Sequence, residues 1–221
     1  MIIAVDGPAG SGKGTVTKRI EQKLGFLNLD TGATYRCVAL ETLRNNIKID
    51  EKDKIIEIAS KIKIEIDNTH EKDIVLLNGE DVSKQIRSKE VTAIVSQISS
   101  IIPVREKMVE IQRKLATGKN VIVEGRDIGT VVFPNADLKI YLDASEEIRA
   151  KRRYKENMEN GINTTYEDVL ENVKLRDYND KNKKVGALKK AEDAIVIDSS
   201  EMSIDEVVDR IQELIKMHQL M

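Results

Sequence analysis

The sequence predicts an α/β protein built on a parallel β-sheet with helices on both faces. Four short apolar runs, rich in β-branched residues and bounded by polar residues or glycine, are typical of strands buried on both faces. These runs are residues 2–5, 121–123, 138–142 and 194–197. Helical stretches separate them, and strands that alternate with helices indicate a parallel sheet. We expect a core sheet of five strands.

Three helices are marked by residues typical of helix ends. The first follows Lys13 and stops at Gly25, and Pro103 opens a second one. The last helix follows Ser203 and Glu206, which form a capping-box pair. One face of that helix carries Ile204, Val207, Val208, Ile211 and Leu214.

Residues 60–100 depart from this alternation of strands and helices. Isoleucines alternate with charged residues over residues 62–66, and a turn-like segment at residues 67–70 follows. The dipeptide Asn78-Gly79 then separates two more short runs. Alternation with a tight Asn-Gly turn predicts small, half-exposed antiparallel hairpins. We expect a core formed by residues 1–59 and 101–221, with residues 60–100 as a separate inserted lobe.

The composition is typical of a globular protein and excludes several classes. The 36 Lys and Arg residues nearly balance the 38 Asp and Glu residues, so a long nucleic acid is not the expected partner. Cys37 is the single cysteine, which excludes an intrachain disulfide. The first apolar run is too short for a signal peptide, and no run has the length of a membrane span. We expect a cytoplasmic protein without a membrane partner.

A phosphate-binding loop directly follows the first strand and precedes a helix, the context that a P-loop requires. Its residues are Gly7, Pro8, Ala9, Gly10, Ser11, Gly12, Lys13, Gly14 and Thr15. Glycines let backbone N–H groups converge on phosphate oxygens, and Lys13 adds a positive charge for the terminal phosphates. Gly14 stands where most P-loops carry Ser or Thr, so Thr15 is the candidate hydroxyl for Mg²⁺. The loop predicts a nucleoside triphosphate site.

Two further segments indicate a second, phosphate-bearing substrate. In the segment after the first helix, Thr31 can cap the next helix, and Arg36 lies about a turn and a half along it, suited to a phosphate. The strand at residues 121–123 ends in Glu124, Arg126 and Asp127. Ligands of open parallel sheets bind beyond the carboxyl ends of the strands, so we expect this cluster beside the phosphate loop.

A run of basic residues and the next helix complete the candidate site. Five of the seven residues in the range 149–155 are basic, which fits either a solvated helix face or a cover over phosphates. On the following helix, Val173, Arg176 and Asp180 lie at helical spacing, so we expect Arg176 to point inward. By composition, residues 177–193 are predicted to be solvated, mobile surface.

Together these motifs resemble those of bacterial cytidylate kinases. The motifs are the phosphate loop, the segment from Asp30 to Arg36, the run from Glu124 to Pro134, and Arg176 with Asp177. The similarity covers nearly the whole chain. It implies a P-loop kinase fold with a mobile lid at about residues 149–185, and makes residues 60–100 a CMP-binding lobe. It also implies transfer of the γ-phosphate of ATP to CMP or dCMP with Mg²⁺ by a monomer.

The resemblance further implies roles for individual residues. The loop residues bind ATP, and Lys13, Arg126, Arg153 and Arg176 are catalytic. Residues matched to CMP binding are Thr31, Arg36, Ser96, Arg105, Glu124, Arg126, Asp127, Arg176, Asp180 and Lys183. Arg105 and Asp127 fall at the cytosine-reading positions.

Some of these assignments depart from the family or depend on it alone. Without the resemblance, Ser96 is a polar residue in a helical stretch, and Arg105 is a first-turn surface residue. Lys183 stands where the family usually carries Arg, so it keeps the charge but loses the bidentate fork. Ala9 stands where some members carry Ser.

Other functions share the phosphate loop and stay open at this stage. A switch GTPase should carry an Asn-Lys-x-Asp segment, but the nearest match, residues 182–185, ends in Val185. Another small-molecule kinase, of adenylate or shikimate kinase type, does not explain the Gly-Arg-Asp segment or the large insert. A non-catalytic nucleotide-binding regulator does not need Lys13, Arg153 and Arg176 together.

Overall fold

The computed structural model describes residues 1–67 and 73–220. The turn predicted at residues 67–70 therefore lies mostly outside the described residues. The strands are β1 Ile2–Asp6, β2 Leu27–Asp30, β3 Ile64–Asp67, β4 Ile74–Leu77, β5 Glu80–Asp81, β6 Val121–Gly125, β7 Leu138–Asp143 and β8 Ile195–Asp198. The α-helices are α1 Lys13–Leu24, α2 Thr31–Arg44, α3 Lys52–Lys61, α4 Lys89–Ile98, α5 Ile102–Ala116, α6 Glu146–Glu159, α7 Tyr166–Lys181 and α8 Ile204–Gln219. Short helical turns lie at Gln85–Arg87 and Ile128–Val132.

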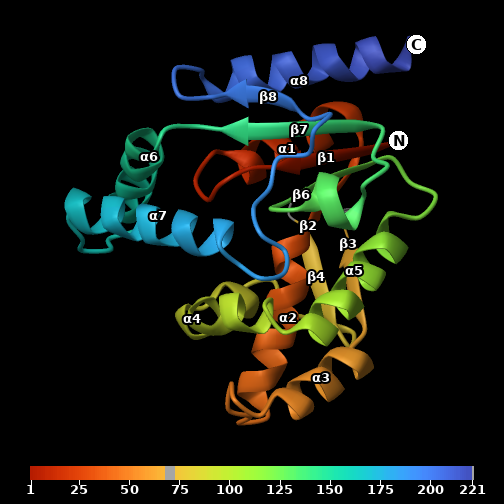
Figure 1. Cartoon of the computed structure of the whole chain (residues 1–221), viewed down its shortest axis with the longest axis vertical. Coiled ribbons are helices and arrows are strands. Elements are labelled where there is room, and N and C mark those ends of the chain that lie inside the picture. The colour runs from red at the N-terminus through yellow and green to blue at the C-terminus, as the bar shows by residue number, and fades with distance from the viewer. Residues whose placement is uncertain (68–72, 221) are drawn as a thin grey trace. The chain divides into compact units, whose positions relative to one another are not determined.

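The core sheet has five strands in the order β2-β6-β1-β7-β8, as predicted (Figure 1). β1 pairs in parallel with β6 and β7, and β7 pairs in parallel with β8. All four predicted strands are present, whereas β2 was not among them. The expectation that every strand is buried on both faces is wrong for β8, where Ile195 and Val196 are exposed because β8 is an edge strand.

The chain divides into two compact units, one formed by residues 1–26 and 120–221 and the other by residues 27–119. In the first unit, a hydrophobic cluster joins β1, β6, β7 and β8 to α1 and α8. The predicted helix ends are confirmed, since α1 ends at Leu24 with Gly25 as its cap and Ser203 and Glu206 form the capping box of α8. A smaller cluster of Ala150, Val169 and Val173 packs α6 against α7.

The second unit has its own hydrophobic core and a small antiparallel sheet of order β3-β4-β5. The predicted Asn-Gly hairpin turn is confirmed, because Asn78 and Gly79 join β4 to β5 with φ angles of 53° and 87°. Positive φ at both central residues is what a two-residue hairpin turn of type I′ requires. The assignment of residues 60–100 as a CMP-binding lobe stays a prediction, and the compact unit that contains them is larger.

Within the described ranges, the helices are too short or too polar for any of them to span a bilayer.

Candidate active site

The phosphate loop connects β1 to α1 in a conformation that depends on glycine. Gly7 lies so close to β7 that a Cβ atom there would stand 2.0 Å from the carbonyl oxygen of Leu142. Gly12 caps α1 with a φ of 94°, a left-handed conformation that residues with a side chain rarely adopt. The loop therefore leads straight into the amino end of α1, where backbone N–H groups and the helix dipole favour an anion.

Lys13, the first residue of α1, is buried within the loop. Its Nζ donates to the carbonyl oxygens of Gly7 at 2.8 Å and Pro8 at 2.7 Å, and to the Ser11 hydroxyl at 3.4 Å. Burial lowers the pKa of Lys13 to about 7, with the charges of Arg126 and Arg176 acting in the same direction. Anionic phosphates would oppose that effect by favouring the protonated form of Lys13, so Nζ is suited to carry a positive charge beside a bound phosphate.

Asp6, at the end of β1, is a buried acid that sequence reasoning missed. Its two carboxylate oxygens accept hydrogen bonds from the backbone N–H groups of Ile128 and Gly129, both at 2.8 Å. Burial raises the pKa of Asp6 to about 6, although these two hydrogen bonds lower it. A polar residue at the carboxyl end of the first strand was the available signal, but its partners lie 122 and 123 residues away in the sequence.

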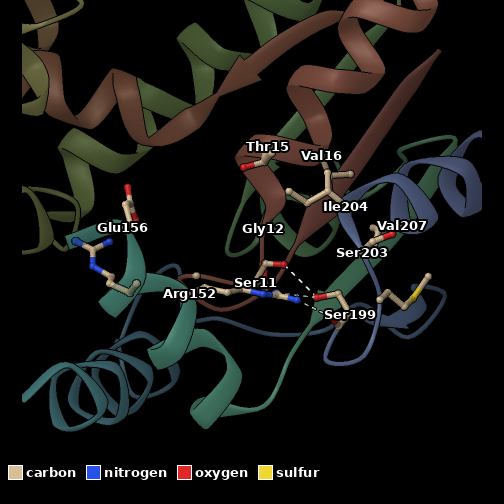
Figure 2. A pocket seen from close by; sticks show the side chains of 13 residues that line it. Ser11, Gly12, Thr15, Val16, Arg152, Glu156, Ser199, Ser203, Ile204 and Val207 are labelled. Carbon is tan, nitrogen blue, oxygen red and sulfur yellow. Dashed lines mark hydrogen bonds between the residues drawn. The ribbon is translucent and has the colours of Figure 1, made fainter. Parts of the chain in front are cut away.

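A cavity of about 310 Å³ opens beside the phosphate loop (Figure 2). The loop contributes Gly10, Ser11, Gly12 and Thr15 to its wall. The remaining lining residues come from α1, from α6, from the segment between β8 and α8, and from α8; they are Val16, Arg152, Arg153, Glu156, Ser199, Met202, Ser203, Ile204 and Val207.

Arg152 lies across this cavity from α6 toward the segment that follows β8 (Figure 2). Its guanidinium donates to the Ser199 carbonyl oxygen at 2.6 Å and to the Ser199 hydroxyl at 3.2 Å. Arg153, one of the three arginines predicted to be catalytic, is exposed and lines the same cavity. The phosphate-loop residues and Arg153 were predicted site residues, whereas Arg152, Glu156 and the lining residues from Ser199 to Val207 were not, because distant segments of chain bring them together.

The segment after β6 supplies an ion-pair cluster on the same unit. Arg126 Nε donates to Asp180 Oδ2 at 2.9 Å, and Lys183 Nζ lies 3.5 Å from Asp180 Oδ1. Burial opposes ionisation of Asp180, but the charges of Arg126, Lys183 and Arg176 lower its pKa overall. Asp127 is buried directly beside Arg126. The structure thus brings together the predicted residues Arg126, Asp180 and Lys183.

The predicted inward position of Arg176 on α7 is wrong. Asp177 is the buried residue at that point of the helix, and Arg176 is exposed. Asp177 accepts from both terminal nitrogens of buried Arg149, with Nη1 at 2.9 Å from Oδ1. Arg149 also donates to the carbonyl oxygen of Ala9 in the phosphate loop at 3.1 Å. At this point of α7 the side chain that faces the interior is therefore Asp177, and it forms an ion pair with Arg149.

The prediction that residues 177–193 form solvated surface by composition is also wrong in part. Asp177 and Asp180 are buried in ion pairs, and Leu188 and Ala191 are buried apolar residues. The backbone N–H of Lys189 donates to the carbonyl oxygen of Arg126 at 3.3 Å. Charged residues give this stretch a polar composition, but Asp177 and Asp180 form ion pairs with arginines elsewhere in the unit.

The other unit holds the remaining predicted CMP-binding residues. Arg36 on α2 donates from Nη1 to the Thr92 hydroxyl at 2.9 Å and to the Ile86 carbonyl oxygen at 3.2 Å. Arg105 is buried, with its guanidinium carbon 5.6 Å from the centre of the Tyr35 ring, so its description as first-turn surface is wrong. Ser96 is exposed on α4. Arg36 and Arg105 are therefore held by contacts within their own unit.

Thr31 begins α2 but does not cap it, so that detail of the prediction is wrong. The N-cap is Asp30, whose side chain accepts from the backbone N–H of Ala33 at 3.3 Å. Thr31 is buried, and its carbonyl oxygen accepts from the Thr34 hydroxyl at 2.8 Å. Thr34 in turn accepts from Gln112 on α5 at 2.8 Å. Asp30 lies directly before Thr31 and is an equally favourable N-cap residue, so the helix begins one residue earlier than predicted.

Two oxygen groups at the amino end of α1 fit a Mg²⁺ ion bound to nucleotide phosphates. Thr15 is an exposed residue there, and Glu124 Oε1 lies 3.1 Å from the point where a Cβ atom of Gly14 would stand. Mg²⁺ at such sites takes one or two protein ligands and several waters. Across residues 1–67 and 73–220, no three His, Cys, Asp or Glu side chains gather into a metal-binding group. Gly14 therefore gives Glu124 the room that a serine or threonine would take.

The cytidylate kinase family profile matches residues 3–217. The chain belongs to the cytidylate kinase family. It is 48% identical to a cytidylate kinase of Caldicellulosiruptor saccharolyticus over 96% of this chain and 94% of that protein. A cytidylate kinase of Fusobacterium nucleatum is 45% identical over 98% of this chain and 97% of that protein.

Solved structures share the fold at low sequence identity. A shikimate kinase from Bacteroides thetaiotaomicron matches with a TM-score of 0.50 and 11% identity, over 98% of each chain. An uncharacterized protein from Eubacterium ventriosum matches with a TM-score of 0.53 and 15% identity, also over 98% of each chain. These likenesses support the P-loop kinase architecture alone.

Proposed function

We propose that this chain transfers the γ-phosphate of ATP to CMP or dCMP, giving ADP and CDP or dCDP. Membership of the cytidylate kinase family supports the reaction. The observation that carries the proposal is the environment of Lys13. The charges of Arg126 and Arg176, assigned to the acceptor and to the transferring phosphate, both act on this phosphate-loop ammonium. This influence on Lys13 supports an acceptor site that adjoins the phosphate loop.

On the donor side, the ATP phosphates bind the loop, and the nucleoside lies in the neighbouring cavity. The loop offers backbone N–H groups and Lys13, and the cavity offers a concave wall of mixed apolar and polar groups. Glu124 and Thr15 would hold the Mg²⁺ that accompanies ATP, directly or through water. The ion would supply positive charge to offset the negative charge of the nucleotide phosphates.

On the acceptor side, Asp127 accepts a hydrogen bond from the cytosine amino group, and Arg105 donates to ring acceptors. Arg36, Arg126 and Lys183 bind the acceptor phosphate, while Thr31, Ser96 and Asp180 contact the nucleoside. Uracil carries a carbonyl where cytosine carries the amine, so UMP would leave the buried Asp127 carboxylate facing an acceptor. This is the physical basis of the expected preference for cytosine.

Transfer itself depends on positioning and charge rather than on a strong general base. Lys13 and the arginines stabilise negative charge that spreads over the oxygens of the transferring phosphate. Arg153 is exposed on the cavity wall, and Arg176 is exposed on α7, so both can reach a bound nucleotide. Closure of residues 149–185 over ATP would exclude water that could otherwise take the phosphate. That closure, the monomeric state and the cytoplasmic location stay predictions.

A coupled assay of ADP formation tests this function. Wild-type protein is given Mg²⁺ and ATP with CMP, dCMP, UMP, AMP or shikimate as the single acceptor. We expect rapid turnover with CMP and dCMP, poor turnover with UMP and none with the other two. Turnover with AMP or shikimate but not with CMP would refute the acceptor assignment. Nucleotide binding without turnover on any acceptor would indicate a regulator instead.

A further inference from the structure

Asp6 is a buried carboxylate that the proposed reaction does not use. It is the last residue of β1, is only 3% exposed, and stands directly before Gly7 of the phosphate loop. Oδ1 accepts from the backbone N–H of Ile128 and Oδ2 from that of Gly129, each at 2.8 Å. Because both oxygens are engaged with backbone, Asp6 is suited to orient the chain rather than to touch a substrate.

The backbone that Asp6 holds begins directly after Asp127. Ile128 and Gly129 are the first two residues of the helical turn Ile128–Val132. The first N–H groups of a helical turn lack partners within it, so an outside acceptor fixes where the turn starts. A carboxylate is a strong acceptor for such groups. The direction of the buried Asp127 side chain therefore depends on the two bonds to Asp6.

Gly129 permits this close approach. A Cβ atom at position 129 would lie 3.4 Å from Asp6 Oδ2 and 3.1 Å from Cδ of Lys139, whose stem packs over the turn. The second distance is shorter than ordinary van der Waals contact between carbon atoms. Asp6 and Gly129, 123 residues apart in the sequence, thus form a hydrogen bond at a close approach that leaves little room for a side chain at position 129.

We infer that Asp6 is a positioning residue for acceptor recognition, which sets the placement of Arg126 and Asp127 relative to the phosphate loop. The inference rests on the proposed function, because that function assigns Arg126 to the acceptor phosphate and Asp127 to cytosine. Through Asp6, the strand that leads into the phosphate loop and the turn that follows Asp127 share one fixed backbone contact. This contact thereby fixes the position of the residues that bind the acceptor relative to the loop that binds the donor phosphates.

The variant Asp6→Asn tests this inference with little change in size. Its amide keeps one oxygen acceptor but turns an NH₂ donor toward a backbone N–H donor, which breaks one of the two bonds. We expect the KM for CMP to rise by about tenfold or more, and the kcat/KM ratio of CMP over UMP to fall by a similar factor. The KM for ATP should change by less than about threefold, because the loop glycines and Lys13 are intact.

Asp137→Asn is the matched control. Asp137 Oδ2 also accepts a backbone N–H of β1, from Ile2 at 2.6 Å, but at the opposite end of the strand from the phosphate loop. This control should keep the wild-type preference for CMP over UMP. A wild-type KM and preference in Asp6→Asn would overturn the inference. An equal loss of preference in Asp137→Asn would overturn it too, since general destabilisation would then explain both.

Gly129→Ala carries the test if Asp6→Asn does not fold. Its methyl group crowds the same carboxylate from the other side, so the same rise in the KM for CMP and loss of preference are expected. Wild-type values in this variant would overturn the inference. Wild-type protein in the same assay separates the two proposals. Silence with CMP would refute the proposed function and the inference together, whereas an active wild type with unchanged variants would refute only the inference.

Discussion

Two buried ionisable side chains near the phosphate loop have displaced pKa values. Burial lowers the pKa of Lys13 and raises that of Asp6, so it disfavours the charged form of both groups, and their partners offset this effect only in part. The charge of Asp127 also raises the pKa of Asp6, and the charge of Lys13 lowers it. The charge of Asp6 in turn contributes to a raised pKa of Tyr141. Such displaced values are typical of functional sites.

The stability of the protein should depend on pH through Asp6. Its folded-state pKa of about 6 is raised from 3.8, so its contribution to the free energy of unfolding is fully present below pH 3.8 and is lost as the pH rises through about 6. Relative to Asp6→Asn, the wild type should lose about 1–2 kcal/mol of unfolding free energy between about pH 5 and about pH 8. Urea unfolding of both proteins at each pH measures this difference. A difference that does not change with pH would contradict it.

Lys183 should limit the affinity for the acceptor because it lacks a guanidinium fork. It lies 3.5 Å from Asp180, at the edge of the cluster that holds Arg126. In Lys183→Arg, two parallel hydrogen bonds to phosphate replace a point charge, and we expect the KM for CMP to fall about threefold. Initial rates at saturating ATP measure it. Lys184→Arg changes an exposed neighbour and should have no effect; an unchanged or higher KM in Lys183→Arg would refute the prediction.

At the scale of elements, Arg149 joins three parts of one unit. From α6 it pairs with Asp177 on α7, donates to the carbonyl oxygen of Ala144 at 2.8 Å, and donates to Ala9 in the phosphate loop. Both partners of the ion pair are buried. A buried charge without its partner is costly, so this single pair couples the packing of α6 and α7 to the phosphate loop.

Arg149→Met should therefore destabilise the fold strongly. We expect a loss of about 3–5 kcal/mol in the free energy of unfolding, because Asp177 would be left buried without its partner. The double variant Arg149→Met/Asp177→Leu should recover part of that loss, since no buried charge remains. Denaturant unfolding measures both. Arg210→Met, which removes an exposed ion pair with Glu213, should cost no more than about 1 kcal/mol. A small loss in Arg149→Met would contradict this account.

At the scale of the whole molecule, features encoded by neighbouring residues were predictable. The apolar runs predicted four strands of the core sheet, and the capping box and the Asn78-Gly79 turn were confirmed. Strand β2 was not predicted because its sequence, Leu-Asn-Leu-Asp, is short and half polar. Thr31 was mistaken for the cap of α2 because Asp30, one residue earlier, is an equally good cap.

The parts of the site that were missed depend on contacts distant in sequence. Asp6, the pair of Arg149 with Asp177 and the cavity wall from Ser199 to Val207 each need the folded chain to bring their partners together. No local spacing encodes those contacts. The sequence motifs predicted which side chains could take part in the chemistry. The fold determines which of these side chains are buried and which acidic and basic residues form ion pairs.

The preference for cytosine over uracil, measured in wild type and Asp127→Ala, shows whether this chain is a CMP kinase that reads the base through Asp127. The kcat/KM for CMP in wild type should exceed that for UMP by at least about a hundredfold, because a site built to bind the amine leaves its acceptor unpaired with uracil. In Asp127→Ala the activity with CMP should fall and the ratio should approach one, while the KM for ATP stays near the wild-type value. A ratio unchanged in Asp127→Ala would contradict the account, since another group would then read the base.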